Sequence, residues 1–319
     1  RPAPGQLDLL ARHAGHHPVL PHGLHRVVRP GLTQVHDLQL ADLTARAWGY
    51  RANTHRIEGR LNSAEKALAE ARRRFATGTG DPLLDAELHE CEAVLRRNQR
   101  RFGAATKSFG RAGKIYRQAD LPLDEARVAI SWASLKEEMG DRADAIELLE
   151  EVLPFVRLAR GNERLYLIGL QVLAVSYARS GQATEARRLL PEIWSYLDPR
   201  VEGLAKLRTV WLEALIHEEE GRESAAPLYR RVQEGFLAAG IPFDAALVSL
   251  DLAALLLRRG KTAAAAELAA DVVPIFEQLE VEREALMSLR LLLEALRNEA
   301  ATVEAVQEAA QTLRRSLVG

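Results

Sequence analysis

The sequence predicts an all-α chain, an α-solenoid of six helical hairpins followed by a C-terminal capping helix pair. Three observations support this prediction. First, the 319 residues are 47% hydrophobic but only 5% aromatic, and Ala, Leu, Glu and Arg, all strong helix formers, are abundant. Second, a turn residue returns about every 40 positions along the chain. Third, an alanine precedes each turn at a constant distance.

The turn position is glycine in every copy but the second. The series is Gly59, Arg100, Gly140, Gly181, Gly221 and Gly260. Glycine adopts a left-handed backbone conformation at little cost, so it suits the end of the first helix of a hairpin. We expect Arg100 to fill the same place in the second copy.

Small residues recur on both sides of each turn. Seven residues before it stand Ala52, Ala93, Ala133, Ala174, Ala214 and Ala253. A small side chain there lets two helices approach closely at their crossing. Five residues after the turn stand Ala64, Ala105, Ala145 and Ala186, each followed four residues later by Leu68, Phe109, Leu149 or Leu190. In the last two copies the best match falls one residue early, as Ala225 with Tyr229 and Ala264 with Leu268.

These spacings define the elements in order. We expect hairpins at about residues 38–76, 81–119, 122–159, 162–198, 200–239 and 242–279. Segments rich in Gly, Pro and Asp, such as TGTGDP at 77–82 and AAGIPFD at 238–244, separate them. The pair at 282–317 lacks the motif and is expected to cap the array, because terminal repeats are commonly atypical. Residues 1–37 belong to no repeat and are expected to pack on the first hairpin as a loop or short helices.

The pattern resembles that of the tetratricopeptide repeat (TPR) family. The first copy matches it at Trp48, Ala52, Gly59, Ala64, Leu68 and Ala71, and the fourth at Leu173, Ala174, Tyr177, Gly181, Ala186 and Leu190. The resemblance covers about residues 38 to 315. The period near 40 is longer than the family's 34 and resembles the arrays of bacterial sensors and scaffolds. It implies a right-handed superhelix that binds a protein or peptide in a concave groove lined by the first helices.

The resemblance also selects side chains for that groove, at six, ten and thirteen residues before each turn. The partner-binding candidates are Arg46, Asn53, Glu90, Arg127, Ser134, Gln171, Arg208 and Trp211. Guanidinium, amide and aromatic groups hold carboxylates, peptide backbones and apolar anchors. Asn53 resembles the groove asparagine that bonds a peptide's backbone or terminal carboxylate in family members. The competing interpretation is that several of these side chains pack against the next repeat.

The charge distribution leaves other functions open. Residues 1–120 carry 20 Lys and Arg against 12 Asp and Glu, whereas residues 121–319 carry 23 against 32. Arginine and lysine cluster at 71–75, 96–101 and 107–117, as nonspecific binding of nucleic acid would require, although we favour the interpretation that they form a solvated basic surface. Another alternative is that the chain is the sensor arm of a larger transcription regulator or signalling protein.

Catalytic motifs are absent from the sequence. It contains no Gly-rich phosphate loop after a strand, no HExxH and no GxSxG, so we expect neither an enzyme nor a cofactor. A single cysteine, Cys91, excludes an internal disulfide, suits a reducing, cytoplasmic compartment, and is expected to be an inert helix residue.

Metal and membrane binding are not expected either. The histidines His13, His16, His17, His22 and His25 are interrupted by Pro18 and Pro21, so we expect no metal site there. The longest apolar stretch, 245–257, is too short to span a bilayer.

Overall fold

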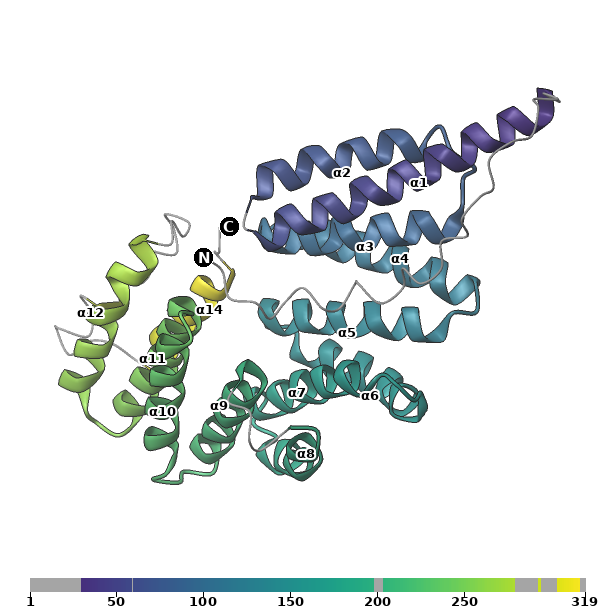
Figure 1. Ribbon diagram of the computed structural model, residues 1–319. Coiled ribbons are helices and arrows are strands. Elements are labelled where there is room, and N and C mark those ends of the chain that lie inside the picture. The colour runs from purple at the N-terminus through teal and green to yellow at the C-terminus, as the bar shows by residue number, and fades with distance from the viewer. Residues whose placement is uncertain (1–29, 59, 198–202, 279–291, 294–302, 316–319) are drawn as a thin grey trace. The chain divides into compact units, whose positions relative to one another are not determined.

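The computed structural model describes residues 30–58, 60–197, 203–278, 292–293 and 303–315, and every regular element among them is an α-helix (Figure 1). The chain divides into two compact units, Arg1–Asp37 and Leu38–Gly319. The first helices of the six hairpins are α1 (Pro30–Ile57), α3 (Pro82–Asn98), α5 (Pro122–Met139), α7 (Glu163–Arg179), α9 (Leu204–Glu219) and α11 (Pro242–Arg258). The second helices are α2 (Leu61–Phe75), α4 (Phe102–Gln118), α6 (Arg142–Leu158), α8 (Ala183–Ser195), α10 (Ala225–Ala238) and α12 (Thr262–Gln278). None of the helices described is long and apolar enough to cross a membrane.

The predicted turn residues adopt the backbone conformation that the sequence requires. Gly140, Gly181, Gly221 and Gly260 have φ between 68° and 91°, and Arg100 has φ 57°. At the third turn the amide of Asp141 donates to the carbonyl of Lys136 at 2.9 Å, which closes the end of α5. The prediction for these five positions is confirmed, and Gly59 lies outside the described residues.

The connections between hairpins also follow the sequence. Gly80, Asp120, Gly161 and Gly240 all have positive φ, so the chain reverses at the predicted loops. Pro82, Pro122 and Pro242 stand at the first positions of α3, α5 and α11. Proline is favoured there because the first turn of a helix leaves its N–H groups unpaired.

The alanines before the turns are all buried, from Ala52 at 1% exposed to Ala253 at 0%. After the turns, Ala64, Ala105, Ala145 and Ala186 are buried, and the early match of Ala225 with Tyr229 in the fifth copy is confirmed. The early match in the sixth copy is wrong. Ala265 and Ala269, at the regular positions, are fully buried, whereas Ala264 and Leu268 are only half-buried. Alanine fills positions 263–266, so side-chain size alone does not identify the buried one.

The core follows the chain as three clusters. The first joins α1, α2 and α3 through residues such as Leu68 and Leu88. The second joins α3, α4 and α5 around Phe109 and Leu135, and the third continues from α5 to the last helix described. A core that passes from each hairpin to the next is typical of repeat arrays.

The last helix described, α14 (Val303–Arg315), packs against α11 and also against α5, the first helix of the third hairpin (Figure 1). Val306, Ala309 and Ala310 are buried, and the Gln311 side-chain amide donates to the carbonyl of Glu138 at 2.6 Å. The capping prediction for 282–317 did not include a contact with α5. Most of the first helix of that pair, predicted at 282–298, lies outside the described residues.

Candidate functional site

The eight partner-binding candidates lie on the first helices, and we call them the first-helix row: Arg46, Asn53, Glu90, Arg127, Ser134, Gln171, Arg208 and Trp211. Several of these side chains contact the next first helix. Arg46 Nε of α1 donates to Glu87 Oε2 of α3 at 2.9 Å, and Glu90 of α3 pairs with Arg127 of α5. Repeats of about 40 residues place equivalent helix positions side by side, so opposite charges at these positions meet.

Arg127 has the densest surroundings in the N-terminal half of the row. Its guanidinium also donates to Asp124 Oδ1 at 2.9 Å and lies 5.8 Å from the centre of the Tyr116 ring. Burial opposes the charge of Arg127, but Glu90 and Asp124 outweigh it and raise the pKa of Arg127. Burial raises the pKa of Glu90, and Arg127 opposes that shift. Each of the two charges therefore favours the charged form of the other.

Asn53 and Ser134 receive hydrogen bonds from arginines. Asn53 Oδ1 accepts from Arg56 Nε at 3.0 Å within α1. Ser134 Oγ accepts from Arg97 Nη2 at 3.0 Å, across the boundary between α3 and α5. The acceptor atoms of both residues are thus engaged within the chain.

The C-terminal half of the row combines amide, indole and guanidinium groups. Gln171 Nε2 donates to Thr209 Oγ1 at 2.8 Å, and Trp211 Nε1 donates to Asp251 Oδ2 at 2.9 Å. The Trp211 ring meets Phe236 edge to face, with centroids 6.0 Å apart. Arg208 is the most exposed charge of the row, at 55%, and lies 3.9 Å from Asp244.

A second set of charges near the C-terminal ends of the first helices was missed from the sequence. Arg97 pairs with Glu138, and Arg179 pairs with Glu137 at 2.7 Å and with Asp251 at 3.6 Å. The signal was present, because Arg97, Glu138 and Arg179 stand one repeat apart with alternating charge. Among the contacts described, the structure brings only Glu90 and Arg127 of the eight candidates together, and the other candidates contact residues outside the row.

No protein-family model matches this chain, and no curated protein matches it in sequence. Among solved structures, aspartyl phosphate phosphatase F from Bacillus subtilis is similar, with a TM-score of 0.59 and 11% identity, covering 82% of this chain and 62% of that one. The apo form of RapI is similar at a TM-score of 0.57 and 14% identity, covering 84% of this chain and 98% of that one. A tetratricopeptide repeat protein from Parabacteroides merdae aligns at a TM-score of 0.49 and 15% identity, over 85% of this chain and 99% of that one.

The fold is that of a TPR-like helical repeat protein. The chain spans less than two thirds of the phosphatase, and identities of 11% and 14% show the fold alone.

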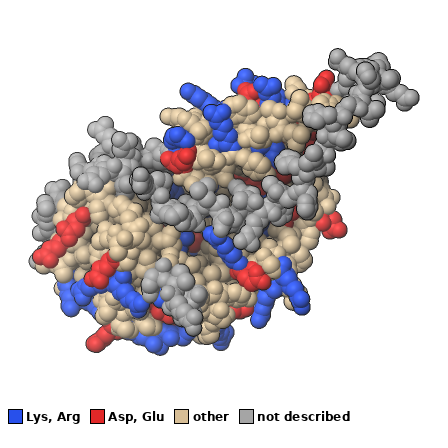
Figure 2. All heavy atoms as spheres, viewed as in Figure 1, with Lys and Arg blue, Asp and Glu red and all other residues tan. Residues whose placement is uncertain are grey.

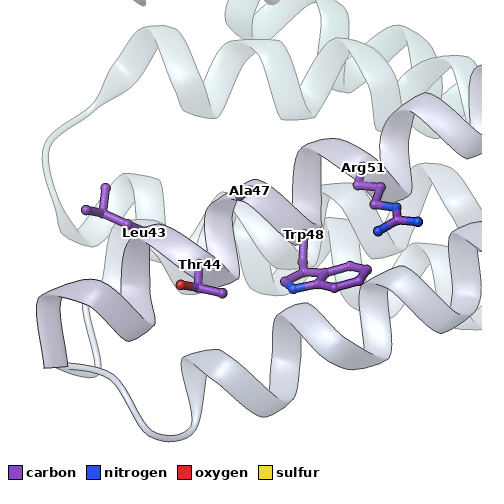
Figure 3. A pocket seen from close by; sticks show the side chains of 5 residues that line it. All are labelled: Leu43, Thr44, Ala47, Trp48 and Arg51. Carbon is purple, nitrogen blue, oxygen red and sulfur yellow. The ribbon is translucent and has the colours of Figure 1, made fainter. Parts of the chain in front are cut away.

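One open hollow of about 370 Å³ lies on α1 of the TPR-like array (Figure 3). Leu43, Thr44, Ala47, Trp48 and Arg51 line it, and the Arg51 guanidinium stacks 4.7 Å from the centre of the Trp48 ring. All five residues belong to this single helix. The hollow does not bring polar groups from different elements together, so we place no small-molecule site there.

Arginines in each of the three basic segments of the TPR-like array pair with carboxylates. Arg72 pairs with Asp85 at 2.5 Å, Arg96 with Glu65 at 2.7 Å, and Arg117 with Glu125 at 2.5 Å. Figure 2 shows positive and negative side chains interspersed over the face in view. Binding of nucleic acid by counterion release requires unneutralised cations, so these pairs remove support from that alternative.

The remaining sequence candidates concern metals and the thiol. Among the residues that the structure describes, no group of three or more His, Cys, Asp or Glu side chains could hold a metal ion. The five N-terminal histidines lie outside them. The Cys91 thiol donates to the carbonyl of Gly49 at 3.6 Å, and burial raises its pKa to about 11.

Proposed function

We propose that this TPR-like array is a non-catalytic module that binds a protein or peptide along its first-helix row. The observation that supports this most is the recurrence of an accessible arginine at the same position, thirteen residues before the turn, in the alternate first helices α1, α5 and α9. Side chains of Arg46, Arg127 and Arg208 are 37%, 35% and 55% exposed although they are paired. Such groups remain accessible to a partner's carboxylates and carbonyls.

The weakest internal pair marks the best entry point for a partner. Arg208 and Asp244 are 3.9 Å apart, so their ion pair contributes little to stability. A partner's carboxylate can therefore replace Asp244 at small cost. Beside it, the Trp211 indole supplies an aromatic surface of the kind that dominates binding energy at interfaces. In this role the chain acts as a scaffold or as the sensor arm of a larger regulator.

We propose no catalytic residue. The phosphatase activity in the name of one similar structure belongs to that protein, and likeness of fold does not transfer chemistry. The Cys91 thiol is protonated at neutral pH because its pKa is raised, which makes it a poor nucleophile.

A peptide-display selection against the purified chain tests this proposal. Enriched peptides are titrated by calorimetry into the wild type and into a double variant, Arg208→Ala with Asn53→Ala. We expect the double variant to lose affinity about tenfold or more, as truncation of interface anchors does.

The matched control is Arg188→Ala, on the second helix α8. Arg188 is 69% exposed and pairs only with Glu185 of its own helix among the ion pairs described. Its affinity should equal that of the wild type, with circular dichroism confirming that all variants fold. If the control and the double variant lose affinity equally, or if neither loses affinity, the binding surface lies away from the first-helix row.

A further inference from the structure

Helix α11 is buried around almost its whole circumference and is mostly apolar. Residues 245–256 are buried except for the half-buried Asp251. Helices that are apolar on all sides need cover on all sides. Here α10 and α12 cover part of the circumference, and α14 covers another part. The surface under α14 therefore requires an occupant, and in this structure the occupant comes from the chain itself.

The contacts of α14 define what this surface accepts. The buried side chains Val306, Ala309 and Ala310 are small and stand at the spacing of one helix face. Glu304, Gln307 and Glu308 are exposed on the other face. The surface thus fits an amphipathic helix with a narrow apolar stripe.

One hydrogen bond fixes the position of the helix. The Gln311 amide donates to the carbonyl of Glu138 in the last turn of α5, where helix carbonyls lack partners within the helix. An apolar stripe and a terminal amide therefore occur in the order Val306, Ala309, Ala310 and Gln311.

We propose that the α5 and α11 surface is a docking site for an amphipathic helix of a partner protein, and that α14 occupies it as an internal competitor. The partner helix carries small apolar residues at the positions of Val306, Ala309 and Ala310, with an amide donor at that of Gln311. The inference rests on the proposed function, since it names a class of partner for the array, but it concerns a different surface from the Arg208 end of the row. Docking a helix on an apolar surface is an established mode of peptide recognition.

The test uses the full chain and a labelled synthetic peptide, TVEAVQEAAQTLRR, which copies residues 302–315. Binding is followed by fluorescence anisotropy. The double substitution Ala309→Asp with Ala310→Asp places charges on the buried face of α14 and should release it. We expect this variant to bind the peptide at least about tenfold more tightly than the wild type, because the competitor is gone. Glu308→Ala, on the exposed face, should leave the affinity at the wild-type value.

Two other results would overturn the proposal, and a second measurement covers the case in which the variant does not fold. A variant that keeps its helix content but does not bind the peptide overturns the proposal. A variant that light scattering shows to be a dimer also overturns it, because the occupant of the surface is then a second copy of the chain. If the variant fails to fold, hydrogen exchange on the wild type decides. Amides of α14 that exchange before those of α11 support displacement, and simultaneous exchange makes α14 a permanent part of the core. If the affinity of the display-selected peptides depends on Arg208 but the α14 peptide does not bind, the proposed function stands and this inference is wrong.

Discussion

Arg100 has a left-handed backbone, a conformation that side chains with a Cβ adopt rarely. Its guanidinium lies 3.2 Å from Glu138 and 5.5 Å from the centre of the Phe102 ring, so the side chain forms contacts that glycine could not. Those contacts offset the backbone cost, of order 1 kcal/mol, that the other copies avoid with glycine. The exception in the repeat is therefore explained by its inter-repeat contacts.

At the same scale, Cys91 yields a prediction for reactivity. Its pKa is raised by burial to about 11, and the thiolate is the reactive form. We expect alkylation by iodoacetamide at pH 8 to be about a hundredfold slower in the folded chain than in urea. The folded rate should then rise about tenfold per pH unit until the pH approaches 11. Equal folded and unfolded rates at pH 8 would show that the thiol is not buried in solution.

Three of the second helices contain a proline in their interior, which is an unfavourable position for this residue. Pro154, Pro191 and Pro274 lie inside α6, α8 and α12, where proline removes a helical hydrogen bond. Pro154 is exposed, so its ring contributes little packing. We expect Pro154→Ala to stabilise the chain by about 1–3 kcal/mol, measured by urea denaturation.

Pro122→Ala is the matched control for that substitution. Pro122 stands at the first position of α5, where no helical bond is lost, so its replacement should not stabilise the chain and should cost at most about 1 kcal/mol through the freer unfolded chain. A gain at both positions would contradict the assignment of the effect to the interior of α6, because the freer unfolded chain of an alanine variant can only lower stability.

The elements of the fold were predictable because each depends on a property of single residues. A turn needs a residue that tolerates positive φ, and a close helix crossing needs a small side chain. The pairings of the candidate site depend instead on register between helices. Gln171 donates to the carbonyl of Ala205 at 3.0 Å, and no local pattern predicts a backbone acceptor on another hairpin. The contact of α14 with α5 was missed for the same reason.

At the scale of the whole molecule, Arg179 joins three hairpins. Its guanidinium, on α7, reaches Glu137 of α5 and Asp251 of α11, and all three side chains are largely buried. Arg179→Ala leaves two buried carboxylates without this cation, so we expect a loss of about 3–5 kcal/mol in the free energy of unfolding.

Arg188→Ala serves as the comparison, because an exposed pair within one helix should change stability by less than about 0.5 kcal/mol. Thermal and urea denaturation of both variants measure the difference. Similar losses would mean that the charges around Arg179 do not hold the hairpins together.

The bond from Gln311 to Glu138 joins residues 173 positions apart, whereas each hairpin closes over a single turn. Contacts that are close in sequence form early, and distant ones wait until the intervening chain has been ordered. During synthesis, the hairpins that contain α5 and α11 can therefore fold before α14 has left the ribosome. In that interval their shared surface is uncovered, and a helix from another nascent or finished protein meets no competition there. Under the proposed docking of a partner helix, complexes formed at the ribosome are then favoured over those formed later by displacement.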